Sequence, residues 1–582
     1  MPAVSVPLPL VLPPAAPVAA PAPAALSAVQ KRAQQPLLAA TWALAALVPA
    51  GPLRFPVEAP PPPVPKRRYR SAYVPPDPAA LIGADLAALS DFELALHVID
   101  FSPLEPLLAA AYRPSRKGQV PFHPVSLFLC VCLRRELAWS WRRLAGLLAS
   151  AHGAGWRAHC GFQAGATPSA SGLRYFFQAV GAAVFDALCP RFIALLREQG
   201  RFPEQSTYPG DPPTRGVTVS QDGMLHPARH RAGCWWATDA CYQPLPTPGE
   251  PAAPQDAAAS NPPPAAGRRP CRARDKQREG CTCATPACLA QCVRASARDP
   301  DARCIHYAGH NHKRAAAGAG AGAGRPAPSR GTDVFGYRSI AERVLDDRFA
   351  VAWTLRSGLY PAATDERTVF GARLQALQAT FPTLRLGEWL DDAGVGYPEC
   401  LTAVWAAGAL RMIDIRADPT DANPQACVAR GYDGQGRPLC PHGYRLRANG
   451  YDAGRRRSKY VCAQACRREP LTPDGPVQPV AGCPYLDPVQ PSGLVVNVGR
   501  TLPDGSVRLA REIPYGSPRW KARYGRRNLS ESRNGQLAGL GLKRLPAYGL
   551  ARGTKEIQVG DFVVNLRTLG RLVREATARA AP

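Results

Sequence analysis

The chain has 582 residues and a formal net charge of +27, a length that excludes a small single-core domain and allows several domains. A basic excess of this size predicts attraction to phosphate backbones or to anionic membranes. Aromatic residues are interleaved with the basic ones, as in WSWRRL, GLRYFF and SPRWKARYGRR. This interleaving favours nucleic acid over a membrane surface as the partner.

The cysteine pattern and the N-terminal composition bear on the compartment. The eighteen cysteines cluster at short spacings in a large chain without a clear signal peptide. Metal-bound thiolates in a reducing cytoplasm fit this pattern better than a secreted disulfide scaffold. The apolar run Pro36–Pro52 is too short to span a membrane and is bracketed by proline. We therefore expect a cytoplasmic protein without a membrane contact, associated with the nucleoid.

The N-terminal third divides into two parts. Residues 1–76 are rich in Ala and Pro and predict a disordered tail, whereas residues 77–203 predict short helices. Pro124 stands near one helix start, Ser140 suits an N-cap, and Pro190 is expected to break between two later helices. Short helices with Arg-Arg pairs are typical of a helix-turn-helix DNA-binding domain, and equally of a helical bundle with basic outer faces.

The segment GVTVSQDG predicts a short buried strand, Val217–Ser220, which ends at Asp222 and a turn at Gly223. An acid just past the end of a core strand is well placed to bind a metal, because the sheet holds it in position. A plain Asp-Gly turn is the alternative, and it is the commoner case for an isolated pair.

Residues 242–331 predict an insertion in which two low-complexity linkers enclose a group of cysteines. The spacings within this group permit several ligands around one Zn²⁺, although no CxxC pair is present. Its members are Cys281, Cys283, Cys288 and Cys292.

The remainder of residues 214–580 alternates strands with helices. Two β-leaning runs flank a polar turn at Asp346–Arg348 and predict a hairpin, and a helix with a Thr-Asp cap follows. LRLGEWLDDAG then predicts a strand that ends at Asp391 and Asp392. The alternation indicates an α/β sheet with crossover helices. Only one of these two acids can face a given side of the sheet, and the small Ala-Gly that follows favours Asp392.

A second cysteine-rich insertion is expected at residues 417–495, with a small β-ribbon between its cysteines. Four thiolates could form a zinc knuckle, with His442 as an alternative ligand. A set of free buried thiols is the other interpretation. The four are Cys440, Cys462, Cys466 and Cys483.

The stretch Trp520–Leu540 is dense in Arg and Lys but has one carboxylate, Glu531, in its middle. From Ala522 to Gln536 it has no proline and predicts a helix, which Gly525 and Gly535 weaken. On a helix, Tyr524, Arg527 and Glu531 share one face. A solvated basic helix with one compensating acid is the alternative interpretation.

Five segments, in this order, resemble motifs of bacterial insertion-sequence transposases of the DDE type. They are SQDG, DPDARCIHY, FGYRSIAERVLDD, LDDAGVGY and YGRRNLSE. The last is similar to the Tyr-x2-Arg-x3-Glu-x6-Lys signature of one large group of these enzymes. The chain departs from the signature at Ala538, which stands at the Lys position, and Lys543 follows five residues later.

The resemblance implies a ribonuclease-H-like catalytic core over residues 214–580, with an N-terminal helical domain and cysteine-rich insertions. It implies that Asp222, Asp392 and Glu531 bind catalytic Mg²⁺ or Mn²⁺. The implied substrate is double-stranded DNA, at the element's terminal repeats and at the target, bound by a homodimer or higher oligomer. Contacts to its phosphates are expected from Tyr524, Arg526 and Arg527.

Two other classes of function remain open. The charge and the cysteine groups equally suit a non-catalytic zinc- and DNA-binding protein, such as a domesticated or inactive relative of these transposases. A nuclease of the same core without strand transfer is a further alternative. Loss of metal-dependent nicking on Asp392→Ala would separate the enzymes from the regulator.

Overall fold

The computed structural model describes only part of the chain. The described residues are 51–56, 68–81, 85–109, 120–229, 299, 301–307, 332–414, 438–440, 442–452, 457–462, 464, 466, 483, 493–498, 513 and 518–580. The disordered tail predicted for residues 1–76 extends too far, because part of this range is folded. Leu53–Arg54 form a strand, β1, which pairs in parallel with β2 (Ile99–Asp100). The Phe55 side chain is buried beside it, so apolar burial holds this segment in place.

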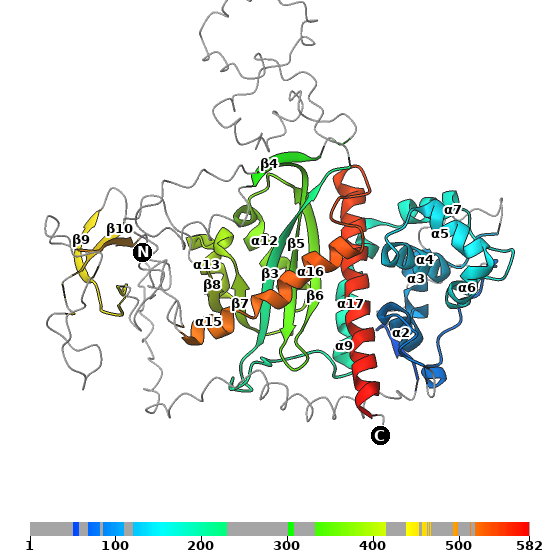
Figure 1. Cartoon of the computed structure of the whole chain (residues 1–582), viewed down its shortest axis with the longest axis horizontal. Coiled ribbons are helices and arrows are strands. Elements are labelled where there is room, and N and C mark those ends of the chain that lie inside the picture. The colour runs from blue at the N-terminus through cyan, green and yellow to red at the C-terminus, as the bar shows by residue number, and fades with distance from the viewer. Residues whose placement is uncertain are drawn as a thin grey trace, which may run out of the picture.

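A mixed six-stranded sheet forms the centre of the molecule, with the order β4-β5-β3-β7-β8 and β6 paired to β5 (Figure 1). The central strand β3 is antiparallel to β5 and parallel to β7, which is in turn parallel to β8. The strands are β3 (Val217–Pro227), β4 (Arg303–Tyr307), β5 (Thr332–Asp346), β6 (Val351–Pro361), β7 (Leu386–Asp391) and β8 (Leu410–Ile413). The α/β class predicted from the alternation is confirmed.

Several local predictions hold in this sheet. Strands β5 and β6 form the predicted hairpin around Asp346–Arg348. Helix α12 (Glu366–Thr380) connects β6 to β7, and its N-cap Asp365 accepts a hydrogen bond from the Arg367 backbone N–H. Helix α13 (Pro398–Ala406) is the crossover between the parallel strands β7 and β8.

The N-terminal helices pack around one long C-terminal helix, α17 (Leu550–Ala580), which the sequence reasoning did not predict. In Figure 1, α17 lies between the sheet and the helices α2 to α7, whereas α9 lies beside α17 next to the sheet. Helix α17 contacts β6, α2, α4, α8 and α9, and α9 itself also contacts β6. Buried side chains from all three parts form one hydrophobic core. The helices are α2 (Asp91–Val98), α3 (Glu105–Ala109), α4 (Pro124–Glu136), α5 (Trp141–Ala149), α6 (Ala154–Cys160), α7 (Ala170–Ala179), α8 (Ala182–Asp186) and α9 (Leu188–Glu198).

The helix starts in this region were partly predicted. Pro124 is the first residue of α4, and the Ser140 side chain caps α5 by accepting from the Arg143 N–H. Pro190 does not break a helix. It lies in the first turn of α9, where a missing N–H costs no intrahelical bond, and the chain bends earlier, at Gly181.

A separate three-stranded sheet is formed by the second cysteine-rich segment, with the four cysteines outside its strands. Its order is β11-β10-β9, all antiparallel, with β9 (Arg447–Asp452), β10 (Arg457–Val461) and β11 (Val495–Val498). A small apolar cluster that includes Leu390, Val496 and Trp520 joins it to the main sheet.

Among the described helices, none is by itself both long and apolar enough to cross a membrane. The bent pair of Ala170–Ala179 with Ala182–Glu198 meets that test by length and composition only.

Candidate active site

Asp222 lies inside β3 instead of at its end. The predicted turn at Gly223 is wrong, because β3 continues to Pro227 and pairs Asp222 with Ala341 of β5. The parallel partner β7, however, pairs only as far as Ser220, so Asp222 lies just past the point where that pairing stops. Burial raises the pKa of the Asp222 carboxyl, whereas nearby arginines, first Arg527, lower it.

The two neighbouring acids after β7 take different positions. Asp391 is the last residue of β7, is buried, and accepts hydrogen bonds from the Trp389 indole at 3.3 Å and the Asp392 N–H at 2.8 Å. Burial raises its pKa well above the usual range. The Asp392 side chain is 49% exposed and caps the following turn by accepting from the Gly394 N–H at 2.6 Å. Asp392 therefore offers the accessible carboxylate of the pair.

Glu531 lies on helix α16 (Arg527–Gly539), and its side chain is 45% exposed. The single helix predicted over this stretch is two helices, α15 (Pro518–Tyr524) and α16, with the break at Gly525 and Arg526. Arg527 is the first residue of α16, one turn before Glu531, so their side chains meet at 2.7 Å.

Arg527 brings the three predicted carboxylates together. One of its nitrogens, Nη2, lies 3.2 Å from Asp222 Oδ1 and 3.6 Å from Asp392 Oδ2, and the other, Nη1, contacts Glu531. Because both contact the same nitrogen, Asp222 Oδ1 and Asp392 Oδ2 cannot be farther apart than the sum of their two distances to Nη2. That sum is below the roughly 8 Å that we take as the limit for sharing two metal ions.

These carboxylates are not grouped for a metal as they stand. Within the described ranges, no group of three or more His, Cys, Asp or Glu side chains is placed to hold a metal ion. The guanidinium of Arg527 lies among the three acids instead. Their oxygen atoms are nevertheless the ligand type that Mg²⁺ binds.

Two further residues at the site were not predicted. Asn534 donates from Nδ2 to Asp222 Oδ2 at 2.7 Å; its position one helical turn after Glu531 could have indicated it. Glu366, in the first turn of α12, lies close enough to Asp392 and Asp222 for their charges to raise its pKa, after the larger effect of burial. A Cβ at Gly223 would lie 2.5 Å from a Glu366 oxygen, so this glycine makes room for the carboxylate. No local sequence signal distinguishes Glu366 from an ordinary acid in a first helical turn.

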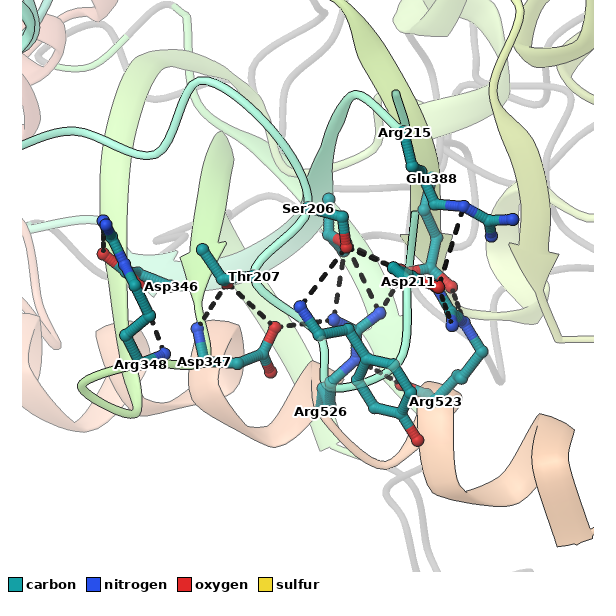
Figure 2. Close-up of polar contacts among 12 residues, drawn as sticks. Ser206, Thr207, Asp211, Arg215, Asp346, Asp347, Arg348, Glu388, Arg523 and Arg526 are labelled. Atoms are coloured by element: carbon teal, nitrogen blue, oxygen red, sulfur yellow. Dashed lines mark hydrogen bonds and ion pairs between the residues drawn. The ribbon is translucent and has the colours of Figure 1, made fainter. Parts of the chain in front are cut away.

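The two arginines that precede Arg527, Arg523 and Arg526, form ion pairs inside the protein (Figure 2). Arg523 binds both oxygens of Asp211, at 2.8 and 2.7 Å, and Glu388 at 2.8 Å. Arg526 contacts Glu388 and lies 2.8 Å from Asp347. Both guanidinium groups also lie over the Tyr208 ring.

This placement changes the expectation for Arg526. Its side chain is 8% exposed and pairs with Glu388 and Asp347, so this guanidinium is held inside the protein and does not face a DNA surface. Tyr524 is half-buried, with its ring stacked on Trp520 at 4.4 Å. Lys543 is exposed beyond the end of α16, and no ion pair joins it to the three carboxylates in the described part of the chain.

The cysteine groups differ in what can be said of them. Cys281, Cys283, Cys288 and Cys292 lie outside the described residues. Cys440, Cys462, Cys466 and Cys483 are free thiols, and Cys440 and Cys462 belong to the small apolar cluster that includes Val496 of β11. Burial raises the pKa of Cys440, and the charges of Cys462 and Cys483 raise it further. Hydrogen bonds from the backbone of His442 and Tyr444 lower it.

Comparisons with models of known families, with curated proteins and with solved structures gave no match.

Proposed function

We propose that this protein is a DDE-type DNA transposase that cleaves and joins DNA strands with divalent metal ions. The observation that carries the proposal is the convergence of Asp222, Asp392 and Glu531 on one guanidinium, from a central strand, a strand end and a helix. A basic DNA-binding regulator needs no such convergence of acids from separate elements.

The sheet order also supports this proposal. Strands β3, β5 and β6 are successive antiparallel neighbours, and β7 and β8 continue the sheet in parallel beside β3. This is the arrangement expected of a ribonuclease-H-like core, with the first acid on the central strand and the second after its parallel neighbour.

In the proposed reaction, Asp222, Asp392 and Glu531 would hold Mg²⁺ or Mn²⁺. When bound, two such ions activate the attacking oxygen and stabilise the leaving oxygen of a phosphodiester. The chain's own residues position the acids: β3 fixes Asp222, Asn534 orients its second oxygen, and the Gly394 N–H orients Asp392. Water would be the first nucleophile, and the freed 3′-hydroxyl would then attack target DNA.

The partner would be double-stranded DNA, bound by at least a homodimer. No Asp or Glu occurs between Glu136 and Asp186, so the surface of α5 to α7 is basic. Arg142, Arg143 and Arg174 are exposed there, and the Tyr175 side chain is 56% exposed. These residue types suit contacts with phosphates and base edges.

The test is to incubate the full chain with Mg²⁺ and DNA that contains its own element ends. Cleavage followed by joining is expected, and Asp392→Asn should abolish both while end binding persists. Glu399→Gln removes an exposed carboxylate on the nearby helix α13 and should leave both steps intact. Sequence-specific binding without cleavage would instead support the non-catalytic regulator.

A further inference from the structure

The arginine at the candidate active site, Arg527, differs from the buried arginines of the same helices, and its side chain is 14% exposed. Arg533 binds Asp561 at 2.6 and 2.8 Å, with both side chains fully buried. Arg527 reaches Asp222 at 3.2 Å and Asp392 only at 3.6 Å. Normal charge-assisted hydrogen bonds measure about 2.7–2.9 Å. Arg527 is therefore shared among three acids, with a close bond to Glu531 alone.

The Arg527 guanidinium also keeps a free donor. Within the described part of the chain, its Nε is buried and has no hydrogen-bond acceptor. An unsatisfied buried donor is costly, and arginine binds phosphate well through two parallel N–H groups. A phosphate oxygen brought to this position would satisfy Nε.

Arg527 is the cation that all three acids share, and the charge of Arg533 acts on Asp222 as well. Among the described residues, each of Asp222, Asp392 and Glu531 has Arg527 as its ion-pair partner. The neighbouring Glu366 has its own partner, Arg338, at 2.7 Å. Without Arg527 or another cation, three carboxylates at one place would repel each other.

We propose that Arg527 is a displaceable internal cation of this site, which occupies the carboxylates until DNA and metal arrive together. A DNA phosphate draws the guanidinium away from Asp222 and Asp392, and the divalent metal then takes its place. Metal affinity and DNA affinity are consequently coupled, and each ligand raises the affinity for the other. This inference rests on the proposed metal site, and it makes Arg527 a positioning residue that acts through the carboxylates.

The test measures Mn²⁺ binding to the full chain by electron paramagnetic resonance of the free ion, without DNA. Arg527→Gln keeps a hydrogen-bonding side chain but removes the charge. We expect Arg527→Gln to bind Mn²⁺ about fivefold or more tightly than the unmodified protein. A short duplex DNA should tighten Mn²⁺ binding by the unmodified protein and have little effect on the variant.

The matched control is Arg571→Gln, which also removes an arginine paired with a glutamate one turn later, but on the exposed face of α17. Its Mn²⁺ affinity should equal that of the unmodified protein. Circular dichroism checks that both variants fold.

Three results would overturn the inference. Weaker Mn²⁺ binding by Arg527→Gln would mean that Arg527 holds the carboxylates in position for the metal and does not compete with it. Equal Mn²⁺ binding by Arg527→Gln and the unmodified protein would exclude competition between Arg527 and the metal. If Asp222→Asn still abolished Mn²⁺ binding in that case, the proposed function would stand without this inference. No Mn²⁺ binding by any protein, with or without DNA, would reject both the inference and the proposed metal site.

Discussion

At the scale of single residues, burial decides which ionisable groups are available for chemistry. Asp391 and Asp392 are neighbours in sequence, yet one is buried against Trp389 and the other is half exposed toward Arg527. The side-chain alternation of a strand predicts that they point apart. The choice of Asp392 therefore followed from local geometry, although its role as a metal ligand stays a prediction.

His226 predicts a pH dependence of stability. It is fully buried between the Leu542 carbonyl oxygen at 2.6 Å and the Ser339 hydroxyl at 2.7 Å. Burial lowers its pKa to about 4, with a further decrease from Arg533 and an opposing increase from the Leu542 contact and Asp561. The unfolded chain binds this proton near pH 6.5. We expect stability to be full above pH 6.5 and to fall by about 3 kcal/mol as the pH decreases to 4.

Urea unfolding at several pH values measures this effect. His226→Gln cannot titrate, so it should lose this part of the pH dependence even if it is less stable at pH 7. The same slope between pH 6.5 and 4 in both proteins would show that another group is responsible.

At the scale of secondary-structure elements, the network of Figure 2 fixes α15 and the start of α16 against the sheet. Glu388 of β7 is fully buried, and it accepts from Arg523, Arg526 and the Thr218 hydroxyl. Glu388→Ala would leave two buried guanidinium groups short of a partner. We expect a loss of about 3–5 kcal/mol in the free energy of unfolding.

The matched control is Glu204→Ala. Glu204 pairs with Arg197 at 2.7 Å, but its side chain is 51% exposed, so its removal should cost less than about 1 kcal/mol. Urea midpoints compare the two variants. Similar small losses for both would mean that the buried network does not hold the helix.

The small sheet predicts a structural zinc site. The Gln464 N–H lies 3.4 Å from Cys462 Sγ, and the backbone of His442 and Tyr444 donates to Cys440. Backbone N–H groups directed at two sulfurs stabilise the thiolates that Zn²⁺ binds. Since the described sulfurs are not yet grouped for a metal, we expect zinc to draw their loops together.

Elemental analysis of the reduced, purified protein should find zinc. Cys466→Ser should lower the zinc content and the thermal stability. Cys400→Ser, at a buried cysteine of α13, should keep the metal. Absence of zinc from the unmodified protein would exclude this site.

At the scale of the whole molecule, the charge of +27 predicts a steep salt dependence of DNA binding. Each phosphate that is neutralised releases counterions, so we expect the affinity to fall at least about a hundredfold between 50 and 200 mM salt. Fluorescence anisotropy with a labelled duplex measures this. Replacing the exposed pair Arg142 and Arg143 with Ala should reduce the slope, and an affinity that does not change with salt would contradict a DNA-binding role.

The largest difference from the sequence prediction also appears at this scale. The N-terminal helices were expected to form a domain apart from the α/β region, but α17 packs on both and joins them in one core. Removing α17 would therefore expose apolar surface of the helices and of β6 together.

The sequence alone determined the local structure. The hairpin around Asp346–Arg348, the Asp365 and Ser140 caps, and the acids at the end of β7 depend on residues a few positions apart, whose periodicity and capping are readable directly. The α/β class follows from the alternation of these elements.

Only the tertiary structure decided which side chains meet. Arg527 and Asp222 are 305 positions apart in the chain, and no local pattern records that the sheet and α16 bring them together. For the same reason Glu366 was not recognised beside Asp222, and Arg526 was not recognised as buried while the next residue faces the acids. Chain folding places these groups through burial of apolar surface elsewhere, so their contacts depend on the whole core and not on the residues around them in sequence.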